Sequence, residues 1–389
     1  MLKQENVTCA LCGFQSEWLG PHIQEAHAMS VEAYQAAHGE VLSAPLQGAL
    51  MLDAPKRVPP NLAKLDLKVG FAGLQASVNL DVPESACLPL PPAYRIPEYG
   101  ALAADVREAS ISLLRGRSMY IHGLPGSGKD ALFHSWSALT RKPARIFQVE
   151  PGVDIQSWFF SKEIGSGGTY WQEGEMLKAL RDGYTTTTGR KIPQMILITD
   201  FDRASKDQAE SMRLVMDSIS GRVKGPNGSM YPVLRGTQIV VTANTAGGGD
   251  SRGRMTSANV IDGSILDRFE RAFEFHWMDW RDEGIIVREK FPLLLGKAPE
   301  VFDQVGRATE ALRKAIHDES LYAEFSHRAV CAWLGHAEDI LAVEPTTPKN
   351  LLRRAFRVVA DKMPDPETRT EAVRIIDPHL KGGAFNGSR

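Results

Sequence analysis

The chain has few cysteines, almost no net charge and no long apolar run, and each shortage excludes a class of protein. Four cysteines in 389 residues are too few for a disulfide framework. A net charge of −2 provides no overall basic surface for nucleic acid. No apolar run approaches the roughly 20 residues of a membrane helix, and the first residues lack the charged start and apolar core of a signal peptide. We therefore expect a cytoplasmic protein with no membrane partner.

The remaining composition is that of an ordinary globular chain. With 43% hydrophobic and 24% charged residues, 389 residues suffice for two domains and a small appendage. Shifts in pattern along the chain predict four parts. These are a zinc finger of the C2H2 type (1–40), a proline-rich linker (41–97) with a short hairpin around 65–82, an α/β nucleotide-binding domain (98–278), and an α-helical domain with a C-terminal tail (279–389).

The first forty residues contain two cysteines and two histidines at metal-binding spacing. Two thiolates from a turn and two imidazoles about one helical turn apart can close a tetrahedral Zn²⁺ site. Leu19, Ile23 and Ala26 would supply the small apolar core that such a finger needs. The predicted zinc ligands are Cys9, Cys12, His22 and His27.

Residues 19–23 and 29–34 resemble the Ros/MucR-like zinc fingers of bacteria and their phages. The resemblance implies DNA binding, which those fingers achieve with lysine and arginine near the finger. This chain departs from that pattern, because residues 1–55 hold one lysine against six acidic residues. Neutralising phosphates takes several cations. We therefore expect zinc binding, and we favour docking to a protein over reading of DNA.

A glycine-rich turn after residue 122 is the strongest chemical signal in the sequence. Residues 119–122 predict a strand, and the spacing Gly123-x4-Gly128-Lys129 is that of a Walker A loop. In such a loop backbone N–H groups converge on phosphate oxygens at a helix N-terminus, and the lysine reaches the β and γ phosphates of ATP. The next residue should be Ser or Thr, a Mg²⁺ ligand, but it is Asp130. The predicted nucleotide-binding residues here are Gly123, Pro125, Gly126, Ser127, Gly128, Lys129, Asp130 and Ala131.

Strands and helices alternate through the central part of the chain, which predicts a parallel five-stranded sheet with helices on both faces. The strands are expected at 118–122, 144–149, 195–200, 238–244 and 271–277. Functional residues should then collect at the carboxyl ends of the strands. After residue 279 strand signals fade, and helices are expected at 301–317, 327–341, 348–363 and 367–376.

Three further motifs accompany the phosphate loop. Residues 195–204 form an apolar strand that delivers carboxylates, the pattern of a Walker B strand. Residues 240–244 form a strand that ends in Asn244, whose amide could hold an attacking water. Residues 265–269 contain Arg268, which could offset charge on a neighbouring subunit's γ-phosphate as an arginine finger.

Together the four motifs resemble the AAA+ ATPases of the MoxR branch. Residues 242–250 and 262–269 look most similar to the ATPase small subunit of cobalt chelatase and its phage and bacterial relatives. The resemblance implies the AAA+ fold with an α-helical lid domain, ATP with Mg²⁺, and a ring that is typically hexameric. It also implies that Asn244 is sensor 1 and Arg268 the arginine finger. Thr347-Pro348-Lys349 looks like the start of the sensor-2 helix, where relatives have Arg after Pro, so Lys349 or Arg353 would serve.

The resemblance also covers an inserted hairpin and the choice of partner. Residues 165–174 look like the hairpin that this branch inserts in helix 2. Its aromatic side chains either contact a partner or pack beneath the hairpin. Relatives commonly work with a von Willebrand A-type protein or a chelatase large subunit.

The Walker B segment departs from the family pattern. Relatives have Asp-Glu-x-Asp/Asn-Arg-Ala, so Thr199 falls at the Mg²⁺-associated Asp and Asp200 at the water-polarising Glu. Our hypothesis is an exchange of hydroxyl and carboxylate across one Mg²⁺ site, with Asp130 and Thr199 as ligands on adjacent strands. One alternative is a decayed site that hydrolyses poorly. The other is a register with Asp200 on the metal side and Phe201 in place of the catalytic Glu.

The sequence thus predicts a ring-forming ATPase that remodels a protein partner, with the finger as a docking arm. Two alternatives stay open. One is a motor that acts on DNA or RNA and is recruited through the finger. The other is a weakly hydrolysing scaffold whose assembly is set by nucleotide.

Overall fold

The computed structural model describes residues 7–16, 19–38, 67–92, 94–165, 168–205, 208, 211–226, 228–249, 258–344 and 350–380. The chain divides into two compact units, Met1–Arg57 and Val58–Arg389. In the described ranges, no helix is both long enough and apolar enough to cross a membrane.

The N-terminal unit is a β-hairpin followed by two short helices. β1 (Val7–Thr8) pairs antiparallel with β2 (Gln15–Ser16), and α1 (Gly20–His27) and α2 (Val31–His38) follow. Leu19 and Ile23 are buried, as the sequence predicts, together with Cys9. The prediction for Ala26 is wrong, since this residue is exposed. Tyr34 of α2 is buried in this core instead. Its large ring fills space that the methyl group of Ala26 could not fill.

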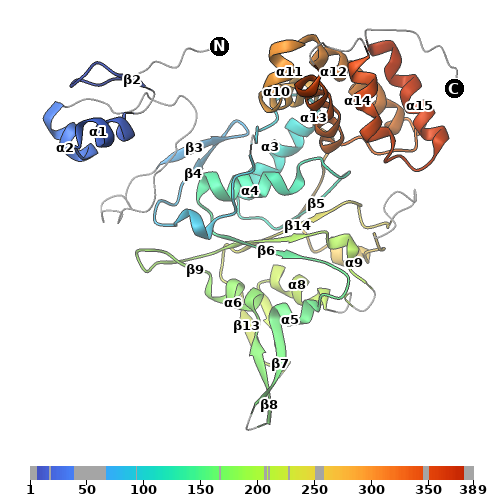
Figure 1. Cartoon of the computed structure of the whole chain (residues 1–389). Helices are drawn as coiled ribbons and strands as arrows, with labels where there is room; N and C mark the ends of the chain where they lie inside the picture. Colours follow the sequence, from blue (N-terminus) through green and yellow to red (C-terminus); the bar gives the residue numbers. More distant parts are fainter. Residues whose placement is uncertain are drawn as a thin grey trace. The chain divides into compact units, whose positions relative to one another are not determined.

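The second unit is built on a five-stranded parallel sheet in the order β15-β5-β14-β11-β6 (Figure 1). The predicted strands all form. Their bounds are β5 Met119–His122, β6 Ala144–Gln148, β11 Met195–Thr199, β14 Gln238–Ala243 and β15 Arg271–Glu274.

The order of the strands corrects one expectation. The Walker A strand β5 and the Walker B strand β11 are not neighbours, because β14 pairs with both of them. All six residues of β14 are buried, which explains its place at the centre of the sheet. Asp130 and Thr199 could therefore bind the same metal ion only across β14.

Alternate strand residues supply two separate cores. In β11, Met195 and Leu197 pack with α3 (Gly100–Leu114) and α4 (Lys129–Thr140), while Ile196 and Ile198 face the opposite side. That second side is covered by α5 (Ile155–Phe159), α6 (Glu175–Asp182) and α8 (Met212–Ile219). Both faces of the sheet are thus buried, as expected when helices connect parallel strands.

The second unit also contains several small β-hairpins outside the parallel sheet. β3 (Lys68–Phe71) and β4 (Leu74–Ser77) form the hairpin predicted within the linker, and Phe71 and Ala76 are buried in the core beside α3 and α4. Two more hairpins pair β9 (Tyr184–Thr185) with β10 (Lys191–Ile192) and β12 (Arg222–Lys224) with β13 (Met230–Pro232).

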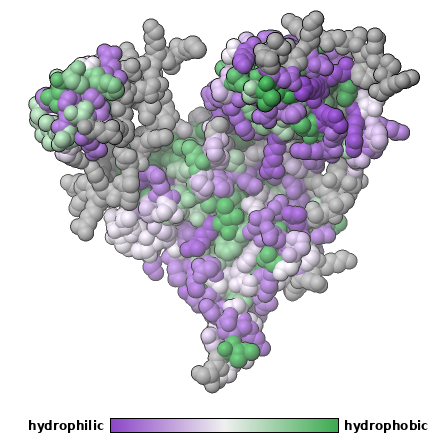
Figure 2. Space-filling model, viewed as in Figure 1, coloured by the Kyte–Doolittle hydropathy of each residue, from purple (hydrophilic) through white to green (hydrophobic). Residues whose placement is uncertain are grey.

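A longer hairpin projects from the helical face. β7 (Phe160–Gly165) pairs antiparallel with β8 (Gly168–Glu173), and the hairpin extends away from the sheet and carries apolar surface on its outer part (Figures 1 and 2). Ile164 is 88% exposed, Tyr170 55% and Trp171 45%. These side chains therefore face solvent and do not pack beneath the hairpin.

The C-terminal part is all helical. Its helices are α10 Trp280–Lys290, α11 Pro292–Lys297, α12 Glu300–His317, α13 His327–Val343, α14 Leu351–Ala360 and α15 Pro366–Ile376. The sequence predicted the last four. It did not predict α10, which contains Gly284 and many charges, yet Asp279 caps this helix by accepting the Arg281 N–H.

Candidate nucleotide-binding site

The phosphate loop joins β5 to α4 and needs its glycines for two close approaches. Gly123 has φ +147°, and a Cβ added there would lie 2.2 Å from the Phe275 carbonyl oxygen. Gly126 has φ +75°, and a Cβ there would lie 2.7 Å from Cβ of Ser326 in the helical domain. The loop therefore lies between Phe275, which follows β15, and the start of α13.

Lys129 is buried at the first position of α4. Its ammonium group donates hydrogen bonds to the carbonyl oxygens of Gly123 (2.7 Å) and Leu124 (3.2 Å) and to Asn244 Oδ1 (3.3 Å). Burial lowers the pKa of Lys129, and the nearby carboxylates oppose that shift. Lys129, the predicted Walker A lysine, thus contacts Asn244, the predicted sensor 1 residue.

Asp130 follows in the first turn of α4 and contacts the central strand. Its Oδ1 accepts a 2.7 Å hydrogen bond from Thr242 Oγ1 of β14. Because Ile198 is paired with Val241, the next residue of β11, Thr199, lies alongside Thr242. One carboxylate and two hydroxyl-bearing residues therefore gather at this edge of the sheet, and oxygen donors of this kind suit Mg²⁺.

Asp200 lies immediately beyond β11 with a left-handed backbone (φ +54°), a conformation that Asp adopts more readily than most residues. Its Oδ2 accepts a hydrogen bond from Gln148 Nε2 of β6 (3.2 Å), and Arg203 lies 3.8 Å away. The next side chain, Phe201, is buried and packs against the rings of Tyr120 and Phe269. Asp200 is thus the acid at the open edge, and Phe201 belongs to the core.

Asp202 was given no role from the sequence, but it organises the sensor segment. Its fully buried carboxylate accepts the backbone N–H groups of Asn244 and Thr245, each at 3.0 Å, through Oδ2. Burial raises the pKa of Asp202. The sequence showed two acids after the strand, but only the fold reveals that the second one points inward and positions Asn244.

The helical domain contacts the phosphate loop through the start of α13. Ser326 and His327 lie against Gly126, and the Trp277 indole donates a 3.2 Å hydrogen bond to the Pro125 carbonyl oxygen. Burial lowers the pKa of Lys129, and the positive charge of Arg328 on α13 adds to that shift.

Of the two residues predicted for sensor 2, the structure describes Arg353. Arg353, on α14, forms a 2.6 Å ion pair with Asp377 inside the helical domain. Lys349 falls outside the described residues. The structure instead places Ser326 and His327 of the helical domain at the loop, which the search for a Thr-Pro-Lys motif missed.

Arg268 is half-exposed just after the short helix α9 (Gly263–Leu266). Its Nη1 lies 3.7 Å from Asp217 Oδ1 of α8. An arginine that serves a neighbouring subunit has to face solvent in the isolated chain, and Arg268 does.

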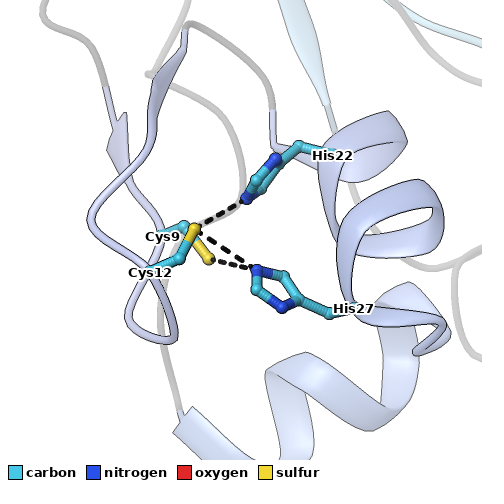
Figure 3. Close-up of side chains that lie close together, drawn as sticks. All are labelled: Cys9, Cys12, His22 and His27. Atoms are coloured by element: carbon cyan, nitrogen blue, oxygen red, sulfur yellow. Dashed lines mark hydrogen bonds between the residues drawn. The ribbon is translucent and has the colours of Figure 1, made fainter.

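The predicted zinc ligands converge in the N-terminal unit (Figure 3). Cys12 Sγ lies 3.1 Å from His22 Nε2 and 3.3 Å from His27 Nε2, and Cys9 Sγ lies 3.5 Å from His27 Nε2. All four ligand atoms lie within 4.8 Å of one another. A tetrahedral ion with Zn–S of about 2.3 Å and Zn–N of about 2.0 Å separates S and N ligands by roughly 3.5 Å. The cluster therefore fits a zinc ion.

The sheet order and the loop after β5 define the class of the second unit: it is a P-loop nucleotide-binding domain of the AAA+ fold. Residues 118–269 match the AAA domain (dynein-related subfamily). The chain therefore carries an AAA ATPase domain, and ATP with Mg²⁺ is the cofactor that such a domain uses.

Solved structures provide a broader comparison. The Thermotoga maritima RuvB Holliday junction branch migration motor is 14% identical, with 71% of this chain and 76% of that chain covered and a TM-score of 0.42. A putative ATPase from Cytophaga hutchinsonii is 13% identical, with 71% and 81% covered and a TM-score of 0.31. No curated protein sequence matches the chain. The assignment of an AAA domain therefore depends on residues 118–269.

Proposed function

We propose that this protein assembles into a ring, typically a hexamer, and uses ATP binding and hydrolysis to remodel a protein partner. The observation that carries this proposal is the β7–β8 hairpin, which displays Ile164, Tyr170 and Trp171 to solvent on the same unit as the phosphate loop. Exposed apolar and aromatic side chains on a projecting element suit contact with unfolded or flexible polypeptide.

The nucleotide would be held by the loop after β5. Backbone N–H groups of residues 123–128, other than Pro125, would meet the phosphates, and Lys129 would exchange its carbonyl partners for phosphate oxygens. Bound Mg²⁺ would neutralise charge that develops on the phosphates. Asp130 and Thr199 would hold the ion, and Thr242 would orient the Asp130 carboxylate, which conserves the ligand types of an ordinary site with their positions exchanged.

Hydrolysis would use residues on either side of that ion. Asp200 would polarise the attacking water, and Asn244, fixed in place by Asp202, would orient it. Arg268 would act on the nucleotide of a neighbouring subunit. In the helical domain, Arg328 is better placed than Arg353 to sense nucleotide, because Arg353 is engaged by Asp377.

The N-terminal unit would serve as a zinc-dependent docking arm. Its four ligands fit Zn²⁺, and the acidic balance of residues 1–55 favours a basic protein surface over a nucleic acid.

The test is an ATPase assay on full-length protein whose mass is measured by light scattering with and without ATP. We would add casein as a flexible polypeptide, or double-stranded or single-stranded DNA. The proposal predicts an ATP-dependent ring whose turnover rises with casein, and Trp171→Ala should abolish that stimulation. Val343→Ala, at an 83% exposed position on α13, is the matched control. Stimulation by DNA alone would instead support a nucleic-acid motor.

A specific observation also favours the weakly hydrolysing scaffold. Asp130 and Thr199 both differ from the usual metal-site residues. A scaffold would assemble with ATP and release almost no phosphate, whatever polymer is added.

A further inference from the structure

Three side chains of the helical domain form a chain of contacts that nucleotide binding does not use. His327, the first residue of α13, has its Nδ1 2.9 Å from Glu283 Oε1 of α10. Its Nε2 lies 3.3 Å from Sγ of Cys331, one helical turn further along. The imidazole therefore bridges a carboxylate and a thiol, which is the arrangement of an activated nucleophile, its base and a group that orients the base.

The charges around this chain favour an ionised thiol. Glu283 is fully buried, and Arg313 of α12 binds both of its oxygens at 2.6 and 3.1 Å, so the carboxylate stays charged. Burial works against charge on His327, but its bonds to Cys331 and Glu283 raise the pKa of the imidazole to about 9. Burial alone would raise the pKa of Cys331, yet His327 and the nearby Lys290 lower it.

The geometry does not suit a metal ion. The carboxylate and the thiol contact opposite nitrogens of one ring, so they cannot share a single ion. Within the described ranges, only the Cys9 cluster brings three or more such ligand atoms together.

We propose that Cys331 is a hydroperoxide-reactive thiol whose oxidation weakens nucleotide binding. The Cys331 thiolate attacks one peroxide oxygen, so an S–O bond forms and the O–O bond breaks. The sulfur loses two electrons to the peroxide. The departing hydroxide or alkoxide takes the Nε2 proton of His327 and leaves as water or alcohol, and Cys331 becomes a sulfenic acid.

Access and position support both halves of the proposal. Cys331 is half-buried, and the His327 side chain is 32% exposed, so a small peroxide can reach the pair. Ser326 and the backbone nitrogen of His327 lie against Gly126 of the phosphate loop. Oxidation removes the proton of His327 and its thiolate partner, and it therefore disturbs the residue that contacts the loop. This second half rests on the proposed ATP-binding function.

Alkylation of the full-length, zinc-loaded protein by iodoacetamide tests the first half, with each cysteine quantified by peptide mass spectrometry from pH 6 to 9. Cys87 is an internal control, because burial raises the pKa of its thiol to about 11. Cys331 should react at least about tenfold faster than Cys87 at pH 7, and its rate should reach half of the maximum at a lower pH than that of an ordinary thiol. His327→Gln should slow Cys331 at least about fivefold at pH 6.5. A Cys331 profile with a midpoint above pH 8 in the wild type would overturn the proposal, and this readout needs no variant to fold.

Peroxide treatment tests the second half. Dimedone should trap a sulfenic acid at Cys331 after stoichiometric hydrogen peroxide. The Kd of a fluorescent ATP analogue should rise at least about threefold in the wild type and stay constant in Cys331→Ser. An equal loss of affinity in Cys331→Ser would refute the link to nucleotide. If the untreated protein bound no nucleotide, the proposed function would fail, while the alkylation result would stand on its own.

Discussion

Thr242 Oγ1 donates a 2.7 Å hydrogen bond to Asp130 Oδ1 and so ties the first turn of α4 to the central strand. The usual hydroxyl at the end of a Walker A loop is absent here, and a neighbouring strand supplies one. Thr199 of β11 lies alongside Thr242 of β14. Under the proposed exchange, these residues and Asp130 would provide the same kinds of oxygen ligand as an ordinary Mg²⁺ site, in different places.

Thr242→Val should weaken Mg²⁺ use more than it weakens the fold. The substitution keeps the shape of the side chain and removes the donor to Asp130, which is exposed and can be solvated by water. We expect the free energy of unfolding to fall by less than about 1.5 kcal/mol. The Mg²⁺ concentration for half-maximal ATP turnover should rise at least threefold, which corresponds to about 0.7 kcal/mol of binding free energy. Thr370→Val, which removes an exposed hydroxyl on α15, should change neither. An unchanged Mg²⁺ dependence in Thr242→Val would show that the contact is incidental.

Asp202→Ala should destabilise the ATPase domain. It leaves the buried N–H groups of Asn244 and Thr245 without an acceptor, and each costs about 1–3 kcal/mol. Urea unfolding should therefore report a loss of about 2–5 kcal/mol, together with a drop in turnover as Asn244 loses its fixed position. Asp202→Asn retains one acceptor oxygen and should lose less. Equal stability of the Ala and Asn variants would contradict the role assigned to this carboxylate.

Removal of zinc should unfold the N-terminal unit alone. Its described core consists of Cys9, Leu19, Ile23 and Tyr34, with Met29 packed against them, which is too small to fold without a metal. We expect one zinc ion per chain by a colorimetric release assay, and loss of that ion in Cys12→Ser. Cys87→Ser is the matched control and should keep the zinc. Basal ATP turnover should be the same with and without a chelator that spares Mg²⁺, because the phosphate loop belongs to the other unit.

The stability of the helical domain should fall at alkaline pH because of His327. The pKa of this imidazole is about 9 in the folded protein and about 6.5 in an unfolded chain. The folded state therefore binds the proton more tightly, so the stabilisation is fully present below about pH 6.5 and is lost as pH rises through about 9.

The difference in thermal midpoint between wild type and His327→Gln should accordingly shrink between pH 6.5 and 9.5. The thermal midpoint of the wild type alone is not enough, because burial lowers the pKa of Lys142 to about 8 and this group makes the fold more stable as pH rises. Subtracting the midpoint of His327→Gln removes that contribution, which both proteins share. A difference that stays constant over this range would exclude a charged His327.

The sequence predicted the fold because its strongest signals are local. Apolar runs mark all five strands, and the glycines of the phosphate loop are required by approaches that the structure confirms at Gly123 and Gly126. The order of the strands was not predictable in this way. The expectation that the Walker strands adjoin is wrong, because β14 lies between β5 and β11. The apolar runs of these three strands are all buried, so burial in the sequence pattern could not rank their positions in the sheet.

Side-chain roles that depend on long-range packing were also missed. Gln148 contacts Asp200 from another strand, and Asp202 turns inward. Ser326 contacts the loop from a helix about two hundred residues away in sequence. Helix α10 was missed for a related reason, since Glu283 is a buried charge whose partners, Arg313 and His327, lie on other helices.

The most direct test of the exchanged metal site is Mg²⁺-dependent ATP hydrolysis by Asp130→Thr, Thr199→Asp and the double variant. Each single variant changes the number of carboxylates at the ion, and each should lower kcat/KM at least about tenfold. The double variant restores one carboxylate and one hydroxyl in the ordinary positions, and it should recover to within about threefold of wild type, which is a strong non-additive coupling. A double variant no more active than the worse single variant would contradict the exchange and leave a site that binds ATP but hydrolyses it poorly.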